Sequence, residues 1–428
     1  MKENIYIHLL KHRCFMAFWG STTLLRLASN ILQFALAIYV LDLTGSAFSY
    51  STVLSVIILP RILCSSFAGY LADYMDSIQL LRRGTLSLTA LMACFFAIHS
   101  FALSLNLPLI YALVISLELC ETFLGPAEGK ALTFIVNQEE IAPASKLSSL
   151  DDGIVEILSP VIGALFYSSR GITGVLAITL FAEAAAFLLS LFIRQNRDTA
   201  ASVDKQDFSA LSLSGTYNAY REAILCLKNY PYIIGIIMFA PLFNFFVSPL
   251  FSVTAAHYFR ITMQADVDMY AMFNTVLGIS GLISPFLAMF FISDKDECKA
   301  LKRGTAAGAV VLLCLSCFLY FAKNLLSPLI PLLTVTAAMA LTTAIVTVMN
   351  IAASITVKKR IPEQILGRVI SVIQLSAAIS IPLGQLFFGL FADKLPVAAS
   401  YLLSSMGLAL TLIMIIRTYR SLRCMRKE

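Results

Sequence analysis

Charged side chains are scarce in this chain of 428 residues. Asp, Glu, Lys and Arg together make up 13% of it, whereas 59% of the residues are hydrophobic. The mean hydropathy is +0.83. A soluble domain needs a charged, hydrated surface, which this composition does not provide. The composition therefore excludes a soluble protein and predicts a polytopic membrane protein.

Clusters of residues that catalyse reactions or bind metals are also missing. The nine cysteines are scattered, which predicts no disulfide framework, and Cys314 and Cys317 have C-x-x-C spacing within an apolar run that lacks a neighbouring histidine. We interpret these cysteines as packing residues. We therefore expect no enzyme, no bound metal and no other cofactor. The four histidines are dispersed, at His8, His12, His99 and His257.

Short strands of alternating hydrophobicity, which would indicate an outer-membrane barrel, are absent as well. The chain instead contains uninterrupted apolar runs, and about 20 such residues span a bilayer as a helix. We therefore predict an all-α membrane protein with twelve transmembrane helices. Their expected ranges are 15–40, 46–72, 84–105, 108–135, 147–169, 171–193, 231–256, 267–292, 304–322, 326–356, 364–392 and 396–416.

Lysine and arginine are divided unevenly between the loops. If both termini are cytoplasmic, most of the 31 Lys and Arg residues fall in cytoplasmic loops and in the basic tail. This imbalance follows the positive-inside rule and supports a multi-pass protein of the inner or plasma membrane. It explains the net charge of +6 without a nucleic-acid partner, and the tail is expected to lie at lipid headgroups. The outer loops keep only Arg170, Arg260, Lys323 and Lys394.

A long polar segment divides the chain into two parts. We predict an N-terminal six-helix bundle at 1–193, a cytoplasmic linker at 194–230, and a C-terminal six-helix bundle with the basic tail at 231–428. The charged turn from Gly69 to Gly84 has a weaker copy from Met289 to Gly304, which indicates two similar halves. Parallel halves of this kind are typical of secondary transporters.

Short motifs carry a family resemblance. Gly69-Tyr-Leu-Ala-Asp73 matches the Gly-x-Leu-Ala-Asp signature that follows the second helix in the major facilitator superfamily. The segments 123–127 and 361–369 resemble the branch that contains macrolide-efflux proteins and bacterial siderophore exporters. The chain therefore resembles this superfamily over essentially its whole length. The resemblance implies the major facilitator fold and transport by alternating access.

A further element resembles drug/proton antiporters. Pro160 and Gly163 lie in Ser-Pro-Val-Ile-Gly-Ala, which is similar to the Gly-Pro-x-x-Gly-Gly element of the fifth antiporter helix. Here Ser159 and Ala164 replace two of the glycines. The match supports the superfamily more than any one subfamily.

The Gly69–Asp73 motif predicts a gate. An anion is stabilised at a helix N-terminus, so we predict that Asp73 docks near Gly367 and Arg368 at the start of the eleventh span. This contact would latch the cytoplasmic side while the transporter faces outward. Gly69 would permit close helix approach. The competing interpretation is a basic turn that only fixes topology, through Arg82 and Arg83.

Ionisable side chains inside the spans are few and costly. Arg26, Asn30 and Gln33 share one face of the first span, and Glu118 and Glu121 share one face of the fourth. Two carboxylates this close repel, which favours protonation of one of them. Since the resemblance places helices 1 and 4 at a central cavity, we predict that Arg26 pairs with one glutamate and that the other carries the proton. A static ion pair without a transport role is the alternative.

Other embedded charges have no assigned partner. Arg61, Glu156 and Glu183 lie within predicted spans, and we favour a structural role for Glu183. The second half carries amides and hydroxyls in place of charges. If these face the cavity they read the polarity of the substrate, whereas helix packing is the competing explanation. The candidates are Asn244, Ser248, Thr343, Thr347 and Asn350.

The expected function is proton-coupled export of drug-like or amphipathic small molecules by a monomeric secondary transporter. The partners would be a small-molecule substrate, the proton and the lipid bilayer. The alternatives are a lysophospholipid or siderophore carrier and, from another class, a membrane sensor or scaffold of the same fold that transports nothing. Aromatic residues in the seventh span suit a bulky substrate, and no long array of arginines indicates a phosphorylated one.

Overall fold

The computed structural model describes residues 5–101, 105–194, 231–291, 297–321, 329–360 and 363–425. Within these ranges the chain is helical and forms no strand. Contacts divide it into two compact units. One contains Met1–Tyr39 and Val56–Leu211, and the other contains Val40–Ser55 and Ser212–Glu428. The second unit therefore includes the end of one early helix and the beginning of the next.

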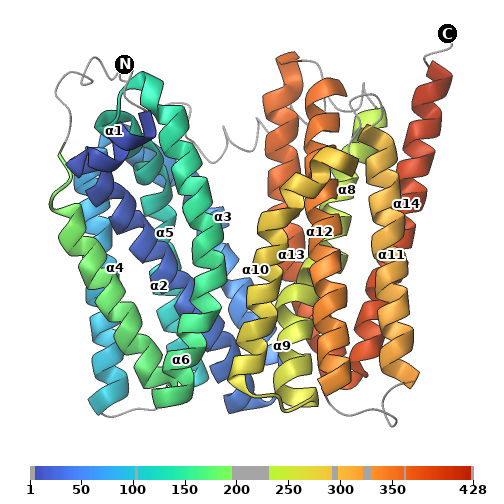
Figure 1. Ribbon diagram of the computed structural model, residues 1–428, viewed down its shortest axis with the longest axis horizontal. Coiled ribbons are helices and arrows are strands. Elements are labelled where there is room, and N and C mark those ends of the chain that lie inside the picture. The colour runs from blue at the N-terminus through green and yellow to red at the C-terminus, as the bar shows by residue number, and fades with distance from the viewer. Residues whose placement is uncertain are drawn as a thin grey trace. The chain divides into compact units, whose positions relative to one another are not determined.

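The early helices are long enough to cross a bilayer, apart from two short pieces (Figure 1). The predicted N-terminal bundle at 1–193 includes residues 40–55. The contacts instead place these residues in the second compact unit. The elements in chain order are α1 (Ile5–Lys11), α2 (Arg13–Thr44), α3 (Ala47–Tyr74), α4 (Ser77–Phe101), α5 (Leu107–Ile135), η1 (Gln138–Glu140) and α6 (Ile141–Ser190).

The later helices begin with a segment that contains two π-helical turns, η4 and η5. The helix that precedes these turns contains two prolines, Pro241 and Pro249. Proline has no backbone N–H, so a carbonyl of the previous helical turn lacks its usual hydrogen-bond donor. The elements are α8 (Pro231–Pro249), η4 (Leu250–Thr254), α9 (Ala255–His257), η5 (Tyr258–Thr262), α10 (Val267–Phe291), α11 (Glu297–Phe321), α12 (Leu329–Arg360), α13 (Glu363–Lys394) and α14 (Val397–Met425).

Eleven helices of the described chain are long and apolar enough to cross a membrane. One of them, α6, covers the predicted span at 147–169 and most of the span at 171–193, and Gly171 separates them with φ 63. Only glycine adopts this backbone conformation without strain.

The count of twelve helices and the cytoplasmic placement of the termini stay predictions. Apart from Arg194, the predicted linker at 194–230 lies outside the described residues.

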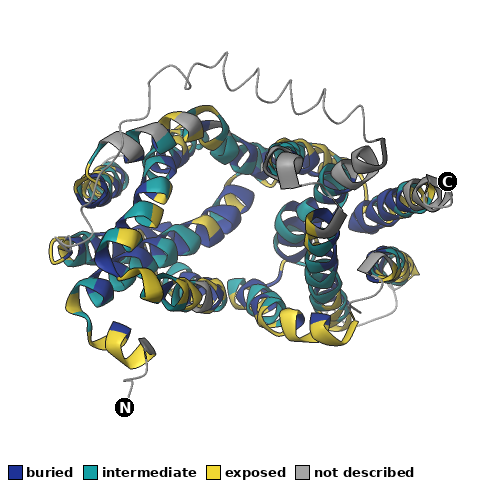
Figure 2. Ribbon diagram, turned by 90° about the horizontal axis from the view of Figure 1, so that it is seen from above, coloured by how far each residue is buried: buried dark blue, intermediate teal, exposed yellow. Residues whose placement is uncertain are grey.

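In the first unit, α2 packs closely against α6. A Cβ atom added to Gly163 would lie 2.7 Å from Cδ1 of Phe34, so the glycine permits this approach. The hydroxyl of Ser21 donates to the carbonyl of Ala186 at 2.8 Å. The short α1 is mostly exposed, except for Leu9 (Figure 2). The predicted helix-5 glycine thus has a packing role.

In the second unit, serine hydroxyls join neighbouring helices. Each donates to a backbone carbonyl of another helix at 2.7 Å. In a membrane, small residues and such hydrogen bonds bring helices together, because lipid supplies no hydrophobic driving force between them. The donor and acceptor pairs are Ser280 with Ala340, Ser316 with Ala398, Ser404 with Phe246, and Ser405 with Ala309.

Glycine packing in the second unit gives a first prediction. A Cβ at Gly407 would lie 2.2 Å from Cγ of Phe246, whereas no described atom outside the local helix lies within 4 Å of a Cβ at Gly281. We expect Gly407→Ala to lower the free energy of unfolding by about 1–3 kcal/mol through overpacking. Gly281→Ala should be neutral or slightly stabilising. Thermal unfolding in detergent measures both, and equal melting temperatures would contradict the packing account.

Candidate functional site

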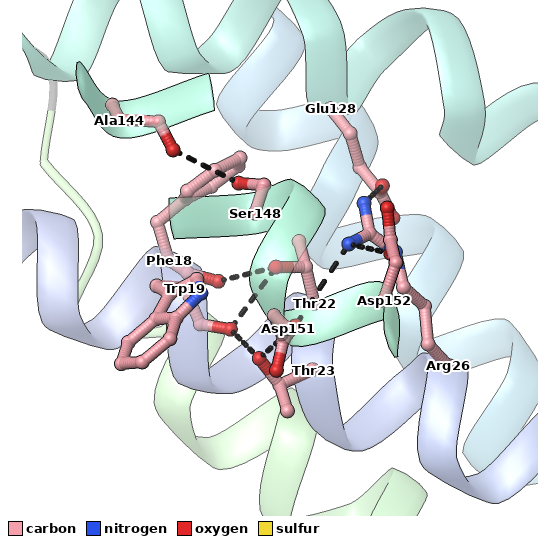
Figure 3. Close-up of polar contacts among 10 residues, drawn as sticks. All are labelled: Phe18, Trp19, Thr22, Thr23, Arg26, Glu128, Ala144, Ser148, Asp151 and Asp152. Carbon is pink, nitrogen blue, oxygen red and sulfur yellow. Dashed lines mark hydrogen bonds and ion pairs between the residues drawn. The ribbon is translucent and has the colours of Figure 1, made fainter. Parts of the chain in front are cut away.

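Arg26 of α2 lies among carboxylates from α5 and α6. Its Nη1 donates to Oδ1 of Asp152 at 2.7 Å and lies 3.9 Å from Oδ2 of Asp151, while Nη2 lies 3.5 Å from Oε2 of Glu128. Figure 3 shows the guanidinium between Glu128 and Asp152. The buried Asp151 also accepts a hydrogen bond from Thr23 Oγ1 at 2.6 Å. One cation thus serves three carboxylates.

Helical spacing explains why these groups meet. Thr23 and Arg26 are three residues apart on α2 and so share a face. Asp151 and Asp152 are consecutive on α6, and both contact this face of α2. Asp151 accepts a hydrogen bond from Thr23, and Asp152 accepts one from Arg26. Thr23 Oγ1 also lies 2.7 Å from the carbonyl oxygen of Trp19, so its single hydroxyl proton is shared between that oxygen and Asp151 (Figure 3). The cluster therefore joins α2 to the first part of α6.

A second ion pair links α3 to α5. Arg61 Nη2 donates to Oε1 of Glu118. Glu118 is 3% exposed, whereas the side chain of Arg61 is 60% exposed. A buried carboxylate needs such a partner, because an uncompensated charge in low dielectric is strongly destabilising. The guanidinium supplies that charge from the accessible side.

Glu121 and Glu183 form the third part of the site. Glu121 accepts a hydrogen bond from the side chain of Ser29 and lies close enough to Glu183 for their charges to repel. Glu183 is 4% exposed, and its Oε2 has no hydrogen-bond partner among the described residues. A buried carboxylate oxygen without a donor is costly when ionised. A proton on Glu183 removes that cost.

Electrostatic contacts connect the whole group. The charges of Glu118 and Glu128 act on Glu121, the charge of Glu121 acts on Glu183, and the charge of Asp152 acts on Glu128. If every group were ionised, six negative charges would face two positive ones. The arrangement can therefore bind protons or a cationic ligand. The six carboxylates are Glu118, Glu121, Glu128, Asp151, Asp152 and Glu183, and the two cations are Arg26 and Arg61.

The predicted pairing of Arg26 with Glu118 or Glu121 is wrong. Arg26 pairs with Asp152, Asp151 and Glu128, and the partner of Glu118 is Arg61. The physical reason is depth along the helices. Spacing shows which face of α2 carries Arg26, but the turn of α5 that lies opposite is set by packing. That turn carries Glu128, seven residues beyond Glu121.

Sequence reasoning missed Glu128 and left Arg61 without a partner. A signal for Glu128 was present, since residues seven apart are two helical turns apart and share a face. Glu121 and Glu128 have this spacing. No local signal pairs Arg61 with Glu118, because the two lie on different helices. Glu156, the other carboxylate without an assigned partner, is exposed on α6.

The other predicted cavity residues are distributed over both units. On α2, Asn30 is half-buried and Gln33 is exposed. In the second unit, the side chains of Asn244, Thr343 and Thr347 donate to backbone carbonyls four residues earlier in their own helices. Such bonds satisfy the donors without a substrate. Ser248 is half-buried and Asn350 is exposed, and a cavity role for any of these residues stays a prediction.

The predicted gate residues are described only in part. The side chains of Asp73 and Arg368 and the surroundings of Gly367 are not described, so their predicted contact is not tested. Arg82 caps the end of α6, because its guanidinium donates to the carbonyls of Ser190 at 3.1 Å, Leu191 at 3.3 Å and Ile193. A cation at a helix C-terminus is stabilising. Arg83 is exposed, and Gly69 is half-buried.

Comparisons with known proteins agree with a helical transporter. The sequence profile of the Major Facilitator Superfamily matches residues 18–385. Macrolide efflux protein A of Streptococcus pyogenes is 22% identical over 401 residues, which cover 91% of this chain and 92% of that protein. An MFS-type transporter of Bacillus subtilis is 24% identical over 229 residues, 52% of this chain and 51% of that protein.

Solved structures share the fold at low identity. A bacterial homologue of the iron transporter ferroportin, in an inward-facing state, has a TM-score of 0.70 at 15% identity, covering 96% of this chain and 98% of its own. A D-xylose–proton symporter has a TM-score of 0.69 at 10% identity, and the match covers 96% of this chain and 97% of the symporter chain. At these identities the likeness concerns the fold alone.

The Arg61–Glu118 pair gives a second prediction. Arg61→Met leaves a buried carboxylate without its cation, so we expect the free energy of unfolding to fall by about 1–3 kcal/mol, less than the loss of a fully buried pair. The loss should be larger at pH 8 than at pH 5, because only the ionised carboxylate needs the arginine. Thermal unfolding at both pH values measures it.

The double variant Arg61→Met with Glu118→Gln is the matched control for this prediction. It removes both charges, so its stability should recover and lose the pH dependence of the single variant. A single variant as stable as the parent at both pH values would contradict the pair.

Proposed function

Because this chain belongs to the Major Facilitator Superfamily, we propose that it is a proton-coupled exporter of drug-like, amphipathic small molecules that works by alternating access. Membership confirms the resemblance inferred from the motifs and makes the chain a multi-pass membrane transporter rather than an enzyme. The observation that carries proton coupling is the excess of carboxylates over arginines in the first unit.

The energetics of buried charge support this proposal. An ionised side chain in a membrane helix costs at least about 2.5–3.5 kcal/mol. Arg26 and Arg61 offset part of this cost for the groups they contact. Among the described residues no ion pair joins Glu121 or Glu183 to an arginine, and the charge of Glu121 repels that of Glu183, so protonation of one of the two stabilises the pair. Proton release requires that the pair gain access to water.

The proposal assigns roles by position. Glu121 and Glu183 carry the proton, whereas Arg61 pairs with Glu118 and Arg26 pairs with Asp152. Glu121 accepts from Ser29 of α2, so its protonation changes a contact between α5 and α2. The substrate cavity is proposed to include Asn30 and Gln33, together with Asn244, Ser248, Thr343, Thr347 and Asn350. The protein works as a monomer in the inner or plasma membrane without a resident cofactor.

The substrate class rests on likeness to macrolide efflux protein A and on charge. Macrolides combine a large apolar ring with a protonated amine, and a site with excess carboxylates favours such a cation. The aromatic residues of α8 give little support for a bulky substrate. Phe239 and Phe243 are buried and stack on each other with ring centroids 5.5 Å apart, which is core packing.

The test uses purified protein in proteoliposomes with a radiolabelled macrolide as probe. We expect an imposed proton gradient to drive macrolide movement, and counterflow to proceed without the gradient. Siderophores and lysophospholipids serve as the competing probes. Movement of one of these alone would assign the carrier alternative, and no movement of any probe under either condition would favour a non-transporting sensor.

Glutamine variants give a third prediction. Glu121→Gln and Glu183→Gln should each lower gradient-driven transport by about tenfold or more, because the amide cannot exchange a proton, while counterflow persists. Glu156→Gln is the matched control, since Glu156 lies on the same helix as Glu183 but is exposed. Normal gradient-driven transport in both test variants would reject the proton-carrier role.

A further inference from the structure

The sequence Gly-x-x-Ala-Asp occurs twice, at the ends of two different helices. The first copy, Gly69–Asp73, closes α3, and the second, Gly389–Asp393, closes α13. The second copy lies beside the beginning of α3, not its end. Because α3 has 28 residues, its two ends lie roughly 40 Å apart, on opposite faces of a bilayer. The two copies therefore serve opposite sides of the membrane.

Asp393 caps the first turn of α3. Its Oδ1 accepts from the backbone N–H of Ala47 at 2.6 Å, and its Oδ2 accepts from the N–H of Phe48 at 3.1 Å and from the hydroxyl of Ser46 at 2.6 Å. Ser46 Oγ in turn accepts from the N–H of Ser49 at 3.2 Å. The first N–H groups of a helix have no partner within it, and a carboxylate here is stabilising.

The glycine and the alanine of the motif also lie in this contact. A Cβ at Gly389 would lie 2.2 Å from Ser51 Oγ and 3.1 Å from the carbonyl of Ala47, so only glycine lets α13 approach α3 this closely. Ala392 packs in a buried cluster with Ala47 and Val253. Glycine, alanine and aspartate of the motif thus each have a defined contact on α3.

An ion pair lies on the other side of the α2–α3 turn. Arg260 of η5 donates from Nη2 to both carboxylate oxygens of Asp42, at 2.8 and 2.9 Å, and from Nη1 to the carbonyl of Ala265 at 2.5 Å. Between Asp42 and Ser46 the chain turns at Gly45, which has φ 65. The turn is therefore held at both ends by residues from 212–428.

We propose that Gly389–Asp393 is a latch that closes the side of the transporter at which α3 begins, and that Arg260 and Asp42 act with it. The proposal rests on alternating access under the proposed function. Residues 40–55 belong to the second unit by contact, but they are continuous with parts of α2 and α3 that belong to the first. Movement between the units must therefore bend these helices or release residues 40–55.

The chemistry of the contact suits reversible release. Asp393 is exposed although it accepts three hydrogen bonds, so water replaces the lost donors when the latch opens. Ala47, Ser51 and Ser55 are spaced four residues apart on α3, and their small side chains leave no interlocking bulk against α13. This is the arrangement predicted for Asp73 at the eleventh span, with the roles of the two helices exchanged.

The test is a labelling rate in a cysteine-free chain that carries Ser55→Cys as reporter. Ser55 is 8% exposed and donates to the carbonyl of Pro382 at 3.2 Å, so a water-soluble methanethiosulfonate reagent should label it slowly. We expect Asp393→Ala and Gly389→Ala each to raise the rate about fivefold or more, since losing one cap or one close contact shifts an equilibrium by about that factor.

Two controls separate release from general loosening. Asp76→Ala removes a comparable cap, because Asp76 Oδ1 accepts from the N–H of Ile78 at 2.9 Å at the start of α4, and it should leave the rate unchanged. Ser51→Gly added to Gly389→Ala removes the clashing atoms and should restore slow labelling. An unchanged rate in both latch variants, or an equal rise with Asp76→Ala, would overturn the latch. Labelling needs neither substrate nor gradient, so this result is independent of the transport assay.

A cross-link tests the same latch from the closed side. Ala47→Cys with Ala392→Cys should form a disulfide on mild oxidation and stop counterflow until it is reduced. Val253→Cys with Ala392→Cys is the matched pair from the same cluster. Its cross-link joins two residues of 212–428 and should leave counterflow intact. Counterflow that survives the first cross-link would show that residues 40–55 need not be released.

Discussion

The cost of placing charge inside a membrane governs the first unit. Several carboxylates of α5 and α6, among them Glu118, Asp151 and Glu183, are buried, and the structure offsets the group with one arginine from α2 and one from α3. Each arginine therefore fixes how its helix packs against the helices that carry carboxylates. The negative charge of Glu121 and Glu183 is offset less completely, and this excess of negative charge favours proton binding at the two groups. Stability and function thus depend on the same charges.

The second unit follows the opposite principle. Its described helices are joined by serine hydroxyls, glycines and packed aromatic rings, and these contacts are insensitive to protonation. Charged contacts in this unit lie at helix ends, where Arg260 forms an ion pair with Asp42 and Asp393 caps α3. A unit held together in this way can keep its internal packing while its contacts at the edge change. The two units therefore contribute different physical properties to one transporter.

Much of the fold could be predicted because hydropathy is a local property. The long apolar runs, the break at Gly171 and the superfamily motif were all readable from neighbouring residues. The candidate site was only partly readable. Arg26 and Glu118 were each recognised as embedded charges, but their mutual pairing was wrong because the actual partners, Asp152 and Arg61, lie on other helices at other depths. Spacing along one helix carries no information about the depth of another.

The sequence by itself determined that this is a helical membrane protein of a transporter family, because composition, run length and short motifs do not depend on how helices are arranged. Only the tertiary structure decided which charges meet, why Arg82 caps α6, and where the second Gly-x-x-Ala-Asp element binds. These outcomes depend on the rotation and depth of each helix. Close packing of side chains from helices distant in sequence sets both.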